Sequence, residues 1–172
     1  IIHVKTDAVG SGSGLNWFDA CVSLNAGVAQ VQGSANTIWV AAGTDNVLAQ
    51  IATNVNIYGG FAGTETQFVD RALSGESIMD GQGFHGCIEI TAGDVLMDHL
   101  VISNGYRLRG GGIYATGHSS LELVDSRIDS CAMTQVADGY GGGAYVSGGT
   151  SSLTRATFVN NTGGPSAYYA RG

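Results

Sequence analysis

The chain of 172 residues has one proline and one lysine, and charged residues make up only 12% of it. Because proline is so scarce and glycine shows no three-residue period, collagen is excluded. Intrinsic disorder is disfavoured, since 44% of the residues are hydrophobic. The apolar runs are shorter than the roughly 20 residues of a transmembrane helix, so no membrane-spanning segment is expected. What remains is a globular chain, which we expect to form a single domain over residues 1–172.

Cations and cysteines are also few. The formal net charge is −7, which argues against a nucleic-acid partner, because phosphate binding needs a basic patch. The presence of a single lysine, Lys5, favours a secreted or surface-exposed protein. The three cysteines, Cys21, Cys87 and Cys131, have no metal-type spacing, and their odd number leaves at least one thiol free. We expect buried, unreactive cysteines.

Glycine, in contrast, is abundant, with 28 residues. Glycine is costly in helix interiors, so a helical bundle fits poorly and a turn-rich β protein fits well. One segment nevertheless has a helical period. Residues 16–32 carry an apolar stripe at spacings of three and four, with Asn16 as the expected N-cap and Gly33 as the stop. The stripe consists of Trp17, Cys21, Leu24, Val28 and Val31. We therefore expect residues 1–36 to form a strand and a capping helix.

The remaining residues, 37–172, contain an internal repeat. Residues 110–115 read GGGIYA and residues 141–146 read GGGAYV, while CIEI at 87–90 precedes them. Two later columns repeat in step with this strand: Met97, Leu123 and Leu153, then Ile102, Ile128 and Phe158. Units of two or three short strands cannot bury their apolar side chains alone and must stack into a shared core. The repeat predicts an all-β parallel β-helix, with glycines at its corners and Pro165 in a loop.

Two segments resemble a known group of proteins. Residues 38–44 (IWVAAGT) and 58–66 (YGGFAGTET), together with Trp17, are similar to the N-terminal part of bacterial right-handed parallel β-helix surface proteins. The later glycine-punctuated coils resemble those of chlamydial polymorphic outer-membrane proteins. The resemblance implies a right-handed β-helix at the cell surface or outside the cell, with an adhesive or structural role. It supplies no catalytic motif.

The first functional hypothesis is a non-catalytic structural module that associates end to end into a fibre or surface assembly. No C-terminal cap is visible in the sequence, so the last coil is expected to present unpaired strand edges. Residues 1–4 offer an apolar strand at the other end, and residues 166–171 are strand-like. Head-to-tail contacts between such ends generate open filaments. We expect a homo-oligomer or homopolymer in which this contact orders both ends.

The alternative is a carbohydrate-binding or polysaccharide-degrading domain. Tyr114, Tyr145 and Tyr168 occupy the same repeat position between inward-facing residues, so they are expected to stack on the outer surface. Such a column is suited to binding a sugar ring or another subunit, and it also fits simple cross-strand stacking.

A second column, His99, Asp125 and Arg155, is flanked by Asp98 and Asp129. It is suited to acid–base chemistry or to a charge-compensated outer ladder. The sequence predicts no cofactor. Structural calcium in the glycine-rich turns at Asp80, Asp94, Asp98 and Asp138 stays open, although the nonapeptide calcium-binding repeat is missing.

Overall fold

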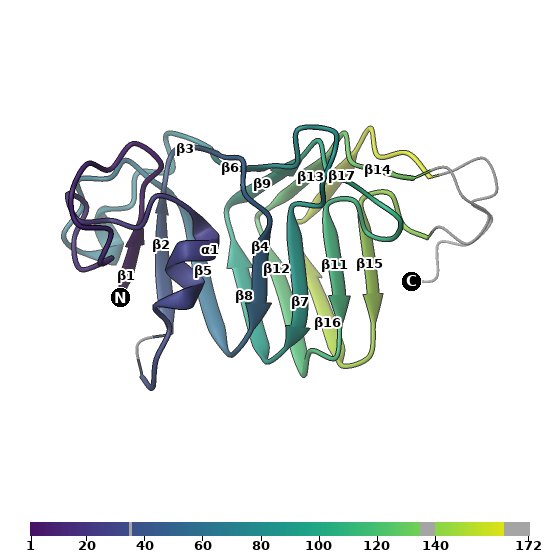
Figure 1. The fold of residues 1–172 in the computed structure, drawn as a ribbon, viewed down its shortest axis with the longest axis horizontal. Helices are drawn as coiled ribbons and strands as arrows, with labels where there is room; N and C mark the ends of the chain where they lie inside the picture. Colours follow the sequence, from purple (N-terminus) through teal and green to yellow (C-terminus); the bar gives the residue numbers. More distant parts are fainter. Residues whose placement is uncertain (35, 135–139, 164–172) are drawn as a thin grey trace.

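The computed structural model describes residues 1–34, 36–134 and 140–163. The chain is mostly β, with 46% of it in strands, and every paired strand that is described runs parallel to its partner. The strands lie side by side along the long axis of the molecule (Figure 1). The predicted all-β, parallel arrangement is confirmed at this level. Among the described helices, none has the length and apolar character needed to cross a membrane.

Three sheets form the body of the molecule. The six-stranded sheet contains, in spatial order, β1 (Ile2–Val4), β2 (Thr37–Ala41), β5 (Val55–Phe61), β8 (Asp94–Asp98), β12 (Ser120–Val124) and β16 (Thr150–Thr154). The five-stranded sheet contains β3 (Gly43–Asp45), β6 (Ser77–Asp80), β9 (Leu100–Ser103), β13 (Arg127–Asp129) and β17 (Thr157–Val159). The four-stranded sheet contains β4 (Ala49–Ala52), β7 (Ile88–Ala92), β11 (Ile113–Thr116) and β15 (Ala144–Ser147).

The chain visits these three sheets in rotation. From β7 onward it passes from the four-stranded to the six-stranded and then to the five-stranded sheet, and repeats this order twice. We call each such set of three strands a circuit; the last described circuit is β15, β16 and β17. Between circuits, β10 (Tyr106–Arg107) pairs with β14 (Ala132–Met133) in a small separate sheet.

The registers confirm both predicted columns. Leu123 pairs with Met97 on one side and with Leu153 on the other. Likewise, Ile128 pairs with Ile102 and with Phe158.

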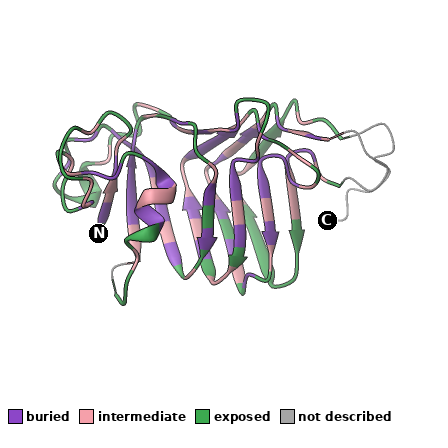
Figure 2. Ribbon diagram, viewed as in Figure 1, coloured by how far each residue is buried: buried purple, intermediate pink, exposed green. Residues whose placement is uncertain are grey.

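The core lies between the sheets and consists of ladders of similar residues (Figure 2). Ile88 and Ile113 are paired neighbours that are almost completely buried, and so are Ile90 and Ala115. Each fully buried aliphatic side chain of this kind contributes about 1.5–3 kcal/mol relative to exposure. A single set of strands is unstable alone. Stacking stabilises it because the buried side chains of successive sets form one continuous core.

The helix differs from the prediction. The helix α1 comprises Leu24–Ala29, and its N-cap is Ser23, whose side chain accepts a hydrogen bond from the Ala26 N–H. Asn16 instead closes a loop, in which it accepts a hydrogen bond from the Asp19 N–H at 2.9 Å. The part of the predicted stripe that precedes residue 24 belongs to this loop. The shorter helix still packs against β1, β2 and β4, as the cap was expected to do (Figure 1).

The outer side of β1 is not open, contrary to the expectation for residues 1–4. The Cys21 N–H donates to the His3 carbonyl, and the Lys5 N–H donates to the Cys21 carbonyl, each at 2.9 Å. The His3 N–H is bonded to Gly14 at 2.8 Å. The loop before α1 therefore occupies the edge that a head-to-tail contact would use.

Glycine shares the corners with other residues. It has a positive φ at the corner from the four-stranded to the six-stranded sheet, at Gly93, Gly117 and Gly148, and just before the four-stranded sheet, at Gly110 and Gly141. The positions directly after the six-stranded and the five-stranded sheets hold left-handed residues that are not glycine, with φ between 46° and 55°. They are His99, Asp125 and Arg155 after the six-stranded sheet, and Asn104, Ser130 and Asn160 after the five-stranded sheet. Asparagine tolerates this left-handed conformation better than most residues. The amides of Asn104 and Asn160 also donate to Asp80 and Asp129 on the adjacent strand of the five-stranded sheet.

Candidate functional site

Tyr114 and Tyr145 lie in register on β11 and β15, with their rings 5.6 Å apart and inclined by 14°. The neighbours of Tyr114 along β11, Ile113 and Ala115, are buried, whereas Tyr114 itself is half-buried. Alternation along the strand therefore turns the tyrosines to the outer face of the four-stranded sheet. The third member of the predicted column, Tyr168, lies outside the described residues.

Tyr114 is enclosed from both sides of the column. On the side away from Tyr145, the preceding strand places Glu89 in register with Tyr114. The guanidinium of Arg107 lies 4.5 Å from the centre of the Tyr114 ring, and its Nη2 donates to Glu89 at 2.7 Å. This hydrogen bond to Arg107 holds the pKa of Glu89 below its usual value. The contacts between Tyr114, Arg107 and Tyr145 are those of a cation–π and stacking ladder that stabilises the sheet surface.

A second arginine extends this surface. The guanidinium of Arg109 lies 5.6 Å from the ring of Tyr145 and 5.4 Å from that of Tyr140. Arg107, Leu108, Arg109 and Tyr114 line a pocket of about 320 Å³. Sequence reasoning missed both arginines. The available signal was the pair of cations separated by one residue just before the repeated glycines of residues 110–112.

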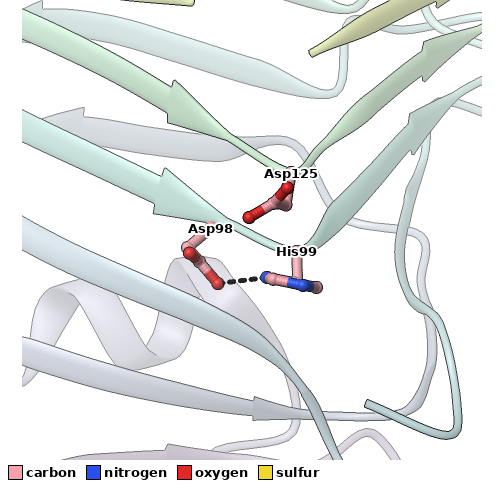
Figure 3. Close-up of side chains that lie close together, drawn as sticks. All are labelled: Asp98, His99 and Asp125. Carbon is pink, nitrogen blue, oxygen red and sulfur yellow. Dashed lines mark hydrogen bonds and ion pairs between the residues drawn. The ribbon is translucent and has the colours of Figure 1, made fainter. Parts of the chain in front are cut away.

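The predicted column at the next corner is also assembled. Asp98, His99 and Asp125 bring one oxygen or nitrogen atom each to within 4.8 Å of the others (Figure 3). The Nδ1 atom of His99 is hydrogen-bonded to Asp98, and Arg155 donates from Nη2 to Asp125 at 2.6 Å. His99 and Asp125 also line a pocket of about 180 Å³.

Asp129, which was expected to flank this column, lies at the following corner. There it accepts a hydrogen bond from Asn160.

Arginines compensate the two carboxylates of this corner. Arg71 donates to Asp98 at 2.8 Å, and both side chains are largely buried. The hydrogen bond from Arg155 lowers the pKa of Asp125, so this carboxyl stays ionised. The guanidinium groups already offset the negative charge that would attract a cation, and an ionised carboxylate is a poor general acid. The geometry is that of a charge-compensated ladder.

The aspartates considered for calcium are spread over different turns. Asp80 accepts hydrogen bonds from the Gln82 N–H and from Asn104, and Asp94 accepts one from Ser120. Asp138 lies outside the described residues. Within the described ranges, the three-residue corner of Figure 3 is the one group with ligand atoms close enough to hold an ion.

All three cysteines are buried and free of disulfides, in line with the expectation of buried thiols. Burial raises the pKa of Cys21, and the Cys131 thiol together with burial raises that of Cys87. Both thiols therefore stay protonated and weakly nucleophilic at neutral pH.

Comparisons with protein families, with curated proteins and with solved structures find no match to this chain. The resemblance to bacterial surface proteins thus stays a prediction from the residues quoted for it.

Proposed function

We propose that the chain is a right-handed parallel β-helix that serves as a non-catalytic structural module, outside the cell or on its surface. The rotation through three parallel sheets supports the β-helix, because each circuit lies in register on the one before it. The single lysine supports the location. The ion-paired corner around Asp98 and Asp125 supports a role without catalysis.

One observation carries the proposal of self-association. The last described circuit exposes residues at positions that are buried in the circuit before it. Leu153 is 59% exposed and its partner Leu123 1%, while Phe158 is 47% exposed and its partner Ile128 is fully buried. Figure 2 shows this change toward exposed residues at β16. In the described ranges, no strand pairs with the outer side of β15, β16 or β17. Such a layer of apolar side chains and free strand edges favours another strand layer.

A second copy of the chain is the occupant we propose. Its own last circuit presents three strands with the same spacing and the same apolar residues, so a two-fold contact is self-complementary. The opposite end is covered by α1 and by the loop bonded to β1. The covered opposite end favours a closed pair through the last described circuit, and the fibre expected from the sequence stays a prediction.

Light scattering over a range of concentrations tests this proposal. We expect the mass of the wild-type protein to rise from one copy toward two, and the double variant Leu153→Asp/Phe158→Asp to stay at one copy. The matched control is Val9→Asp, at a residue that is 81% exposed in the loop before α1. A wild-type protein that remains monomeric at every concentration would contradict the proposal, as would a dimer that the double variant leaves intact.

The second candidate is a glycan-binding domain, and the pocket beside the tyrosine column favours it. Aromatic rings next to hydrogen-bonding groups are typical of ligand sites. The stacked rings of Tyr114 and Tyr145 are half-buried on the outer face of the four-stranded sheet. On a glycan array we expect binding that Tyr145→Ala abolishes. An array without any binding would remove this candidate.

A further inference from the structure

We propose that the pocket between Arg107 and Arg109 binds the carboxylate of an acidic saccharide, such as a uronate. This inference rests on the second candidate function and specifies the class of glycan. The two arginines lie beside the outer face of the four-stranded sheet, and Leu108 and Tyr114 complete the pocket. The pocket is an open surface depression of about 320 Å³, which leaves most of a bound sugar exposed to solvent.

The two guanidinium groups differ in their partners. Arg107 is ion-paired with Glu89, with a nitrogen–oxygen distance of 2.7 Å. Arg109 has no ion pair with any residue in the described ranges, although it is half-buried against Tyr140 and Tyr145. Among the described residues of a chain of net charge −7, Arg109 is thus a cation without an ion-pair partner, at the edge of a pocket. An anionic group placed beside Arg109 supplies the missing counter-charge.

Two polar atoms point to the same deficit. Nη1 of Arg107 and Nε of Arg109 are buried and have no hydrogen-bond partner among the described residues. Burying a hydrogen-bond donor without a partner costs free energy. Here the two guanidinium groups have only cation–π contacts with the ring faces of Tyr114 and Tyr145 near these atoms. A guanidinium group presents its donors in a planar fork that matches a carboxylate, so a ligand carboxylate beside Arg109 would accept hydrogen bonds from it.

The surroundings favour a sugar as the carrier of the carboxylate. Leu108, which is 44% exposed, and the edge of Tyr114 provide apolar contact for one face of a ring. Glu89 and Gln50, which are hydrogen-bonded at 3.2 Å in the same outer column, extend the polar surface along it. The negative charge of the whole chain disfavours densely sulfated polymers, so an isolated carboxylate is the better match.

Calorimetric titration with three probes tests the inference: a uronate-terminated oligosaccharide, the neutral oligosaccharide of the same length, and sodium sulfate. We expect saturable binding of the uronate, weakened at least about tenfold in the neutral sugar and in Arg109→Gln. Arg155→Gln is the matched control, because it removes the same charge at a distant, exposed corner; we expect it to bind like the wild type. Arg109→Lys retains the positive charge but loses the planar arrangement of guanidinium donors, so we expect an intermediate affinity for the uronate. Thermal melting establishes that each variant is folded.

The remaining outcomes separate the two proposals. Equal binding of neutral and acidic sugars would overturn the carboxylate site and leave glycan binding standing. Binding of sulfate alone, with no response to either sugar, would overturn both proposals. Uronate binding that Arg109→Gln leaves unchanged would also overturn the site, since the contact would then lie elsewhere on the surface.

Discussion

Gly117 and Gly83 have nearly the same left-handed backbone, with φ of 77° and 75°, but different surroundings. A Cβ atom on Gly117 would lie 2.7 Å from the Thr91 carbonyl oxygen, whereas one on Gly83 would have no neighbour within 4 Å. We expect Gly83→Ala to cost about 1 kcal/mol from backbone strain alone. Gly117→Ala adds a clash that moves a β7 carbonyl, so its loss should be larger by about 1 kcal/mol or more.

Denaturant unfolding of both variants measures this difference. Because the backbone conformation is matched, the comparison isolates close approach between circuits from the left-handed conformation itself. Equal losses in the two variants would mean that the distance between circuits does not constrain this corner.

Glu65 is a second residue whose individual contribution to stability can be measured. Its burial would raise its pKa, but backbone N–H groups, among them those of Ala62, Thr64 and Gly63 at 2.5, 2.9 and 2.9 Å, outweigh burial and lower it. A carboxyl with a lowered pKa contributes stability above its unfolded value of about 4.3 and loses it as the pH falls through the folded value. We expect Glu65→Gln to cost about 2 kcal/mol at pH 7, with the difference from wild type shrinking below about pH 4.

Unfolding curves of wild type and Glu65→Gln at several pH values test the role of Glu65. If the difference in unfolding free energy stays constant from pH 7 down to pH 3, the ionised form of Glu65 is not what stabilises the turn at residues 62–65.

Single residues also show where sequence reasoning reaches its limit. Tyr114 and Tyr145 are predictable neighbours because they share a repeat position, and register follows from the repeat. Arg107 and Arg109 lie in the segment between circuits, outside the strands whose residues repeat in the sequence, so their place beside Tyr114 and Tyr145 does not follow from the repeat. His99 and Asp125 were predicted to be adjacent. Their left-handed backbone was not, because such residues resemble ordinary polar turn residues in a sequence.

At the scale of elements, α1 is short and depends on its contacts. Six residues are too few for a helix to be stable alone, so packing has to hold it in place. Leu24 is fully buried, and Val28 faces the same core. The Leu24 N–H also donates to Asp45 on β3 at 2.5 Å, which ties the start of the helix to the sheet.

Two substitutions, one at the start of α1 and one just before the helix, test whether α1 caps the core. We expect Leu24→Ala to cost 2–5 kcal/mol, because it opens a cavity at the covered end, as estimated roughly from buried leucine deletions. Val22→Ala, at a residue that is 54% exposed, should change stability by less than about 0.5 kcal/mol. Thermal and denaturant unfolding measure both. Similar small effects would mean that the helix lies on the surface without sealing the core.

The error in the helix boundaries has a physical origin. Trp17 and Cys21 fit the helical spacing, but tertiary contacts give them other positions. The Trp17 indole donates to the Glu65 carbonyl at 2.8 Å and contacts Phe61. The backbone of Cys21 forms a parallel β-bridge with Val4 of β1. Apolar spacing records which residues are buried and cannot distinguish burial by a helix from burial by a folded loop. Gly27 is the residue that shows how closely α1 packs on β1, since a Cβ atom there would lie 2.6 Å from the Val4 side chain.

At the scale of the whole molecule, stability is expected to vary along the stack of circuits. In a stacked repeat each unit contacts only its neighbours, so an outer unit has half of the stabilising interface of an inner one. The strands β8 and β12 have a paired strand on both sides, whereas β16 is paired with β12 alone in the described ranges. Local opening should therefore be easiest in the last described circuit.

Hydrogen exchange resolved by residue measures this gradient. At low protein concentration we expect amides of β16 and β17 to exchange faster than those of β8 and β12 by roughly a hundredfold, a difference of about 3 kcal/mol in opening. At high concentration the proposed pairing of two copies covers the outer edges of these strands, so their exchange should slow while that of β8 and β12 stays the same. The Leu153→Asp/Phe158→Asp variant should lose this concentration dependence and keep the gradient. Uniform exchange across the strands would contradict the stacked-unit view of stability, and a gradient that is independent of concentration would contradict the pairing alone.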